Sequence, residues 1–131
     1  MKVVLVAEDD PMDRRLLELA AKVSGGLALQ FVRDGAEVIA YLKGERDYAN
    51  RGLFPLPEIL VLDLHMPPMG GLDVIQWLTG SEEFKRLKVF LLSGSEMPAA
   101  LAEIKARGVS VTPKPTEPRL LVEFAKGLAQ A

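Results

Sequence analysis

Five short apolar runs recur along the chain, and each is followed by a segment with the periodicity of an amphipathic helix. The runs are rich in Val, Leu and Ile and have the length of strands that are covered on both faces. Regular alternation of strand and helix predicts an α/β fold with a parallel sheet. We expect the five strands at Lys2–Ala7, Leu27–Val32, Ile59–Leu62, Lys88–Leu92 and Val109–Thr112.

Glycine and proline mark the ends of the intervening helices. Pro11 fits the first turn of a helix that Asp10 caps and that Gly25-Gly26 ends. A second helix is expected between Gly35 and Gly44, because its apolar positions recur at helical spacing. The remaining helices are expected at Leu72–Leu78, at Pro98–Arg107 and after a cap at Thr116.

The order of the strands determines which loops meet. Right-handed crossovers place helices on both faces of a parallel sheet, and a chain of this size usually has the flavodoxin-like, doubly wound (βα)5 order 2-1-3-4-5. The first and third strands are then neighbours. Glu8 and Asp9, which follow the first strand, are therefore expected beside Asp63, which ends the third.

Composition limits the classes of protein that the chain can form. The 131 residues are 49% hydrophobic and 26% charged, which fits one compact domain with an ordinary core. A formal charge of -2 favours neither nucleic acid nor an anionic membrane as a partner. The chain has no cysteine, which excludes disulfides and thiolate sites and fits a reducing compartment, so we expect a cytoplasmic protein. The first apolar run is too short for a signal peptide or a membrane span.

The acids at the predicted sheet edge indicate a metal site. Glu8, Asp9 and Asp63 would repel one another and raise each other's pKa unless a cation lay among them. Oxygen ligands with no His or Cys nearby indicate a hard ion, and Mg²⁺ suits a few carboxylates with water and a phosphate group. Ser93 and Lys114 follow the fourth and fifth strands at the same edge. A hydroxyl and an ammonium beside a metal-bound carboxylate form a site for one phosphoryl group.

The same residues carry a family resemblance. From about Lys2 to Leu128 the chain resembles the receiver domain of two-component response regulators. Each motif is weak alone, but their order and their positions at strand ends are specific. The motifs are Glu8-Asp9-Asp10-Pro11, Asp63-Leu64-His65-Met66-Pro67 with Gly71, Leu92-Ser93-Gly94, and Lys114-Pro115.

The resemblance implies a role for each residue of the site. Asp63 matches the phosphoacceptor, which attacks a phosphohistidine on a sensor histidine kinase and becomes an acyl phosphate. Ser93 matches the switch hydroxyl, and Lys114 matches the phosphate-binding lysine. The implied Mg²⁺ ligands are Asp9 and Asp63 directly, Glu8 through a water molecule, and the backbone carbonyl of His65.

The resemblance also implies a mode of signalling. We expect one receiver domain over residues 1–131 with no output domain, so that the signal passes to a separate protein. The fourth helix, fifth strand and fifth helix are the surface implied for this readout, and a homodimer through them is an open alternative. Val111 occupies a position where receivers often carry an aromatic residue of the switch. The segment from Glu45 to Pro57 is similar to that of stand-alone receivers paired with large sensor kinases, including photoreceptor kinases.

Two other functions are weighed against the signalling role, in which the chain is not an enzyme in its own right. The first is a Mg²⁺-dependent phosphatase with Asp63 as its nucleophile, which would need a second acid two residues later, where the chain has His65. The second is a receiver-like interaction module that works without phosphorylation. The intact set of site residues argues against this second alternative.

Overall fold

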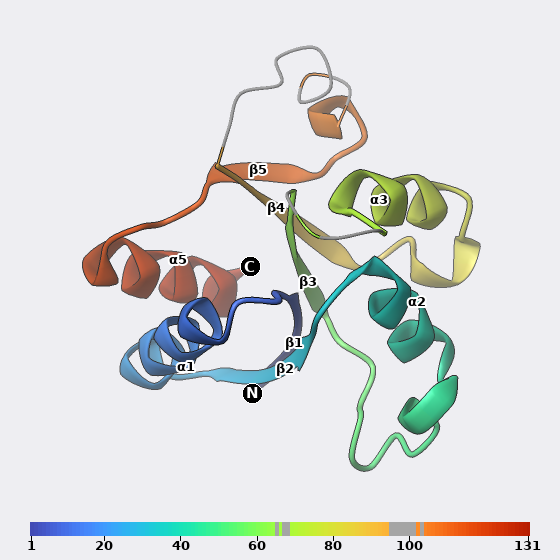
Figure 1. Cartoon of the computed structure of the whole chain (residues 1–131), viewed down its shortest axis with the longest axis horizontal. Helices are drawn as coiled ribbons and strands as arrows, with labels where there is room; N and C mark the ends of the chain where they lie inside the picture. The colour runs from blue at the N-terminus through green and yellow to red at the C-terminus, as the bar shows by residue number, and fades with distance from the viewer. Residues whose placement is uncertain (65, 67–68, 95–101, 103) are drawn as a thin grey trace.

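The computed structural model contains one five-stranded parallel sheet (Figure 1). It describes residues 1–64, 66, 69–94, 102 and 104–131. The strand order is β2-β1-β3-β4-β5, as the sequence predicts, so β1 and β3 are neighbours and the short β5 is at an edge. The strands are β1 Lys2–Ala7, β2 Leu27–Val32, β3 Ile59–Asp63, β4 Lys88–Ser93 and β5 Ser110–Pro113.

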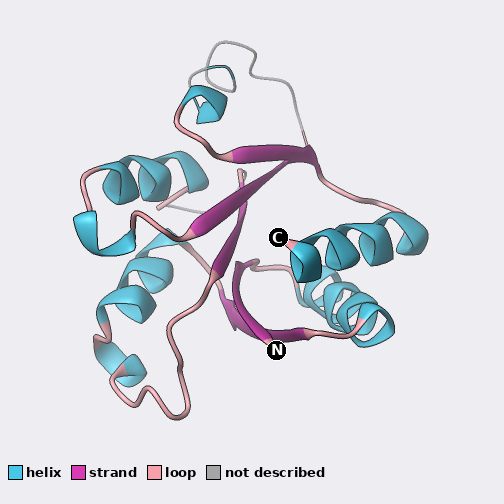
Figure 2. Ribbon diagram, turned by 180° about the vertical axis from the view of Figure 1, so that it is seen from behind, coloured by secondary structure: helices cyan, strands magenta, loops and turns pink. Residues whose placement is uncertain are grey.

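Helices cover both faces of the sheet (Figures 1 and 2). α1 and α5 pack together on one face, and α2 and α3 pack together on the other. Of the fourth helix predicted at Pro98–Arg107, residues 102 and 104–106 are helical, and its first turn lies outside the described residues. The other helices of the described residues are α1 Pro11–Ser24, α2 Gly35–Lys43, α3 Gly71–Thr79 and α5 Pro118–Gln130, with short 3-10 helices η1 Arg46–Tyr48 and η2 Glu82–Phe84.

Most predicted helix ends are confirmed, and one is wrong. The side chain of Asp10 accepts a hydrogen bond from the backbone of Met12 and so caps α1. Gly44 ends α2 in the left-handed conformation, with φ of 69°. The predicted cap at Thr116 is wrong, because α5 begins at Pro118 and its cap position is Glu117. The residue before a proline is held in extended backbone, which moves the boundary to Glu117.

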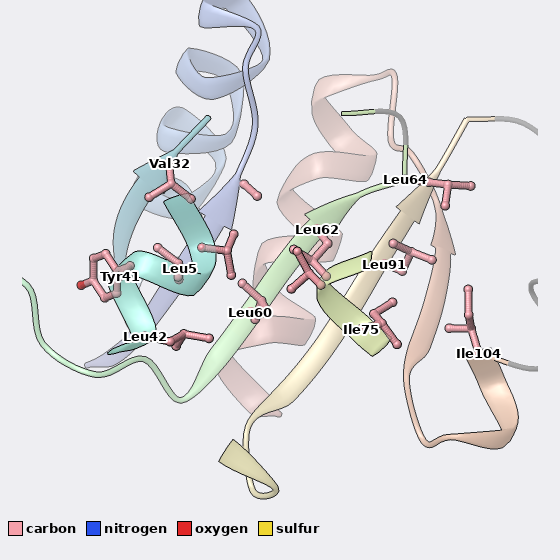
Figure 3. Packing of buried hydrophobic residues seen from close by; sticks show 13 residues of the cluster. Leu5, Val32, Tyr41, Leu42, Leu60, Leu62, Leu64, Ile75, Leu91 and Ile104 are labelled. Carbon is pink, nitrogen blue, oxygen red and sulfur yellow. The ribbon is translucent and has the colours of Figure 1, made fainter. Parts of the chain in front are cut away.

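The core has two layers, one on each face of the sheet. Successive residues of a buried strand point to opposite faces. Leu60 and Leu62 of β3 therefore belong to the layer under α2 and α3, shown in Figure 3, whereas Ile59 and Val61 belong to the layer under α1 and α5. This alternation predicts that the next residue, Asp63, points toward the side of α1 and α5.

The segment between α2 and β3 is a packed structure with a short 3-10 helix. The guanidinium of Arg51 donates hydrogen bonds to the carbonyl oxygens of Tyr41 at 2.9 Å, Leu42 at 2.9 Å and Phe54 at 3.1 Å. The first two carbonyls belong to the last turn of α2, whose carbonyl groups lack partners within the helix. Arg51 therefore joins this segment to the end of α2.

In the part of the chain that the structure describes, no helix has both the length and the apolar character that crossing a bilayer requires.

Candidate functional site

Asp63 is the last residue of β3 and is almost completely buried. Its side chain is only 7% exposed. The close approach of α3 to this strand end depends on a glycine. A Cβ atom at Gly71 would lie 3.0 Å from the carbonyl oxygen of Asp63 and 3.1 Å from Cδ1 of Leu91. Gly71 thus lets α3 begin directly beside the end of β3.

Lys114 joins Asp63 to two other acids. Its Nζ lies 2.7 Å from Oδ2 of Asp63, and Oε1 of Glu8 and Oδ2 of Asp13 each lie at 3.0 Å. The backbone N–H of Lys114 donates to the carbonyl oxygen of Ser93 at 3.0 Å. Lys114 follows β5 and Ser93 ends β4, so this bond holds the two predicted site residues at one edge of the sheet.

Burial and hydrogen bonding shift the pKa of two groups at the site, Glu8 and Lys114. Burial raises the pKa of Glu8 above its usual value of 4.5, and its hydrogen bonds with Lys114 and with the backbone N–H of Asp10 offset only part of that rise. Burial by itself would lower the pKa of Lys114, but its hydrogen bonds to Asp63, Glu8 and Asp13 outweigh burial and raise it. Lys114 therefore remains a cation at any pH at which the site works.

The three consecutive acids after β1 take three different positions. Glu8 is buried and faces Lys114, whereas Asp9 and Asp10 are exposed. The carboxylate of Glu8 also accepts from the backbone N–H of Asp10 at 3.2 Å, and its carbonyl oxygen accepts from Nε of Arg14 at 2.6 Å. Asp10 is used to cap α1. These contacts fix Glu8 at the site, while Asp9 lies at the solvent boundary.

The carboxylate oxygens at the site are of the kind that bind a hard metal ion. Glu8, Asp13 and Asp63 supply carboxylate oxygens around a single ammonium, so the group carries more negative than positive charge. An additional cation would offset that excess. Among the described residues, however, no three His, Cys, Asp or Glu side chains are already arranged around a metal position. In this structure the carboxylates converge on Lys114.

Of the three remaining predicted positions, Ser93 and Val111 lie within the described residues. Ser93 is half-buried at the end of β4, at the same edge as Asp63. Val111 lies within β5, opposite Leu91 of β4. His65, whose backbone carbonyl was predicted as a metal ligand, lies outside the described residues.

Asp13 is the residue at the site that the sequence prediction did not include. It lies in the first turn of α1, three positions after the cap Asp10. Helices that follow parallel strands begin at the edge where those strands end. An acid in the first turn of such a helix was therefore the available signal, but it is also the residue that a helix N-terminus favours for its own stability.

Comparison with known proteins gives a family and close structural relatives. Residues 4–126 match the family model described as the response regulator receiver domain. The chain is also similar to "Response regulator Rcp1" of Synechocystis, with 33% identity over 95 residues, which are 72% of this chain and 63% of Rcp1. The match thus spans less than two thirds of that relative.

Three solved structures share the fold over nearly the whole chain. Response regulator RPA3017, described "in red light signaling of R. palustris", has a TM-score of 0.87 and 35% identity over 98% of this chain and 91% of its own. The Mn²⁺-bound form of Rcp1 has a TM-score of 0.84 and 27% identity, with the same coverage of both chains. The phosphorylated cyanobacterial phytochrome response regulator RcpA has a TM-score of 0.84 and 28% identity, again over 98% of this chain and 91% of its own.

Proposed function

Since this chain belongs to the response regulator receiver domain family, we propose that it accepts a phosphoryl group on Asp63 and passes the signal to a partner protein. One observation carries this proposal. Asp63 is a buried carboxylate at the carboxyl end of a central strand, and the ammonium of Lys114 lies 2.7 Å from it. A nucleophile beside a fixed positive charge is what transfer of an anionic phosphoryl group requires.

The donor in this proposal is a phosphohistidine of a sensor kinase. An Oδ atom of Asp63 forms a bond to phosphorus, and the bond between phosphorus and the histidine nitrogen breaks, leaving its electron pair on that nitrogen. Lys114 neutralises part of the charge on the phosphoryl oxygens, and the hydroxyl of Ser93 donates a hydrogen bond to one of them. After transfer, the new dianion holds Ser93 and Lys114 and biases the surface around them.

We propose Mg²⁺ as the cofactor, held by Asp9 and Asp63 directly, by Glu8 through a water molecule and by the backbone carbonyl of His65. The bound ion would supply electrostatic stabilisation of the transferring phosphoryl group. The excess of carboxylates around Lys114 supports a cation at this edge. The Mn²⁺-bound form of Rcp1 supports a divalent metal in a relative.

The kinase partner that we propose is of the phytochrome type. RPA3017 is described in red light signalling and RcpA as a phytochrome response regulator, and both resemble this chain over 98% of its length. Phosphotransfer profiling against a panel of sensor kinases tests this choice. A phytochrome-type kinase should transfer to the chain faster than kinases of other classes, and equal rates across the panel would contradict it.

The phosphoacceptor role is tested by incubating the protein with Mg²⁺ and acetyl phosphate. Attack by Asp63 on phosphorus releases acetate, so the intact mass should rise by one phosphoryl group. The Asp63→Asn variant keeps the size of the side chain and should show no adduct. An undiminished adduct in that variant, or none on the wild-type protein, would overturn the proposed function.

The phosphatase alternative has a separate test. A phosphatase would turn over p-nitrophenyl phosphate continuously and would lose that activity in Asp63→Asn. A phosphoacceptor instead takes up one group and releases it slowly. Steady turnover that depends on Asp63 would therefore favour the enzyme over the signalling protein.

A further inference from the structure

We propose that Asp13 is a positioning residue for Lys114. Its carboxylate competes with the phosphoryl group for the ammonium of Lys114 and thereby slows phosphorylation of Asp63. This inference rests on the proposed function, because it concerns the control of the same site. It starts from a contact that joins the first turn of α1 to the loop after β5: Oδ2 of Asp13 lies 3.0 Å from Nζ of Lys114.

The contact uses one of the donors of Lys114. An ammonium has three N–H groups, and carboxylate oxygens of Asp63, Glu8 and Asp13 lie at 2.7, 3.0 and 3.0 Å from Nζ. Asp13 is therefore as close to the ammonium as Glu8 is. With these partners in place, the charge that Lys114 can offer to a phosphoryl group is shared with Asp13.

The backbone of Asp13 is held firmly. Pro11 occupies the first position of α1 and restricts its own φ, and Oδ1 of Asp10 accepts from the backbone N–H of Met12 at 2.8 Å and of Asp13 at 3.4 Å. The carboxylate of Asp13 is thus presented to Lys114 from an ordered turn. Holding Lys114 in this way favours one of the many conformations of its long side chain.

Asp13 differs from the other two acids in its contact with water. The side chain of Asp13 is 36% exposed, against 8% for Glu8 and 7% for Asp63. Water can therefore replace the ammonium at Asp13, whereas a buried carboxylate that loses its partner is costly. Asp13 is accordingly the partner that Lys114 releases when a phosphoryl group arrives on Asp63, and the free energy of that release opposes phosphorylation.

The test compares rates of phosphorylation by acetyl phosphate with saturating Mg²⁺. Asp13→Asn keeps the size of the side chain and removes its charge, and we expect its rate constant to rise about two- to fivefold, the range for a partly exposed ion pair. Glu18→Gln is the matched control, because it removes the same charge from α1 at a residue that pairs with Arg15. Its rate should equal that of the wild type.

A double-mutant cycle separates action through Lys114 from general repulsion of the anionic donor. The acceleration by Asp13→Asn should disappear in a Lys114→Met background if Asp13 acts through the ammonium. Persistence of the acceleration in that background, or an unchanged or slower rate in the single variant, would overturn the inference. If Lys114→Met is too slow for a rate, the same four proteins are compared by urea unfolding, where zero coupling between the two positions overturns it.

The outcomes of this experiment are distinct from failure of the proposed function. If the wild-type protein takes up no phosphate, the proposed function fails. If the wild-type protein is phosphorylated but Asp13→Asn reacts at the same rate as the wild type, the role of Asp13 fails and the phosphoacceptor role stands.

Discussion

Among single residues, burial and neighbouring charges have opposing effects on the pKa of Glu8 and of Lys114. Glu8 is buried and contacts Lys114, yet burial raises the pKa of its carboxyl by more than its hydrogen bonds with Lys114 and Asp10 lower it. Lys114 gains more from its three carboxylate partners than it loses by burial. The site therefore favours the charged form of Lys114 and disfavours the charged form of Glu8.

The raised pKa of Glu8 predicts a specific dependence of stability on pH. Between 4.5 and the higher pKa of the folded state, the folded protein binds more protons at Glu8 than the unfolded chain does. The contribution of Glu8 to the free energy of unfolding should then fall as pH rises through this window. Glu8→Gln removes this titration, so its stability relative to wild type should increase as pH rises from about 4 upward, since unperturbed Glu titrates near this pH.

The measurement is urea unfolding of both proteins in metal-free buffer containing a chelator. Glu18→Gln is the control, because the Glu18 side chain is 42% exposed and pairs with Arg15 of the same helix, and it should track the wild type across the pH range. A stability difference between Glu8→Gln and wild type that is constant with pH would show that the pKa of Glu8 is not raised by folding.

At the scale of elements, the segment from Glu45 to Pro57 shows how one side chain can order a long connection. Arg51 donates to carbonyl groups both in the last turn of α2 and in the segment itself. The ring of Tyr41 also packs against Tyr48 and Phe54 of the segment, with centroids 5.1 and 6.0 Å apart. The segment is therefore a fixed part of the face formed by α2.

Loss of the Arg51 hydrogen bonds should lower the free energy of unfolding. Arg51→Ala leaves partly buried carbonyl groups without their charged donor, so we expect the free energy of unfolding to fall by about 2 kcal/mol. Arg119→Ala is the matched control, because the Arg119 side chain is 78% exposed and its guanidinium lies 4.0 Å from the carboxylate of Glu117. Urea denaturation should show a change within about 0.5 kcal/mol for the control. Equal small effects of both substitutions would mean that Arg51 does not stabilise the segment.

At the scale of the whole molecule, the sheet brings together acids and a cation that are far apart in the sequence. Lys114 and Asp63 are 51 positions apart, yet they meet because β3, β4 and β5 are consecutive in the sheet. The folded chain thus presents a cluster of carboxylates that the unfolded chain does not have. A metal ion that binds this cluster must stabilise the fold by mass action.

Thermal unfolding tests the proposed metal site without any phosphotransfer. At a Mg²⁺ concentration ten times its Kd, the free energy of unfolding should rise by about 1.4 kcal/mol and the melting temperature by a few degrees. Asp9→Asn should lose this increase, whereas KCl at the same ionic strength should not reproduce it. A melting temperature that millimolar Mg²⁺ leaves unchanged would count against Mg²⁺ at these residues.

Much of this arrangement was predictable because it depends on local patterns and on general rules of sheet topology. Apolar runs and helix ends locate the strands, and the strand order then brings the residues after β1, β3, β4 and β5 to one edge. Glu8, Asp63, Ser93 and Lys114 were predicted together for this reason. The cap at Thr116 was predicted wrongly, because capping residues compete locally and the position of Pro118 decided between them.

The layers, the strand order and the edge of the sheet at which the site residues gather therefore follow from the sequence. Which of those residues touch depends on the tertiary structure. Asp13, and not the exposed Asp9, contacts Lys114 because of the direction in which its side chain leaves α1. The side chain of Arg51 reaches the carbonyl groups at the end of α2 for the same kind of reason. Those directions depend on long-range packing, which periodicity and spacing along the chain do not record.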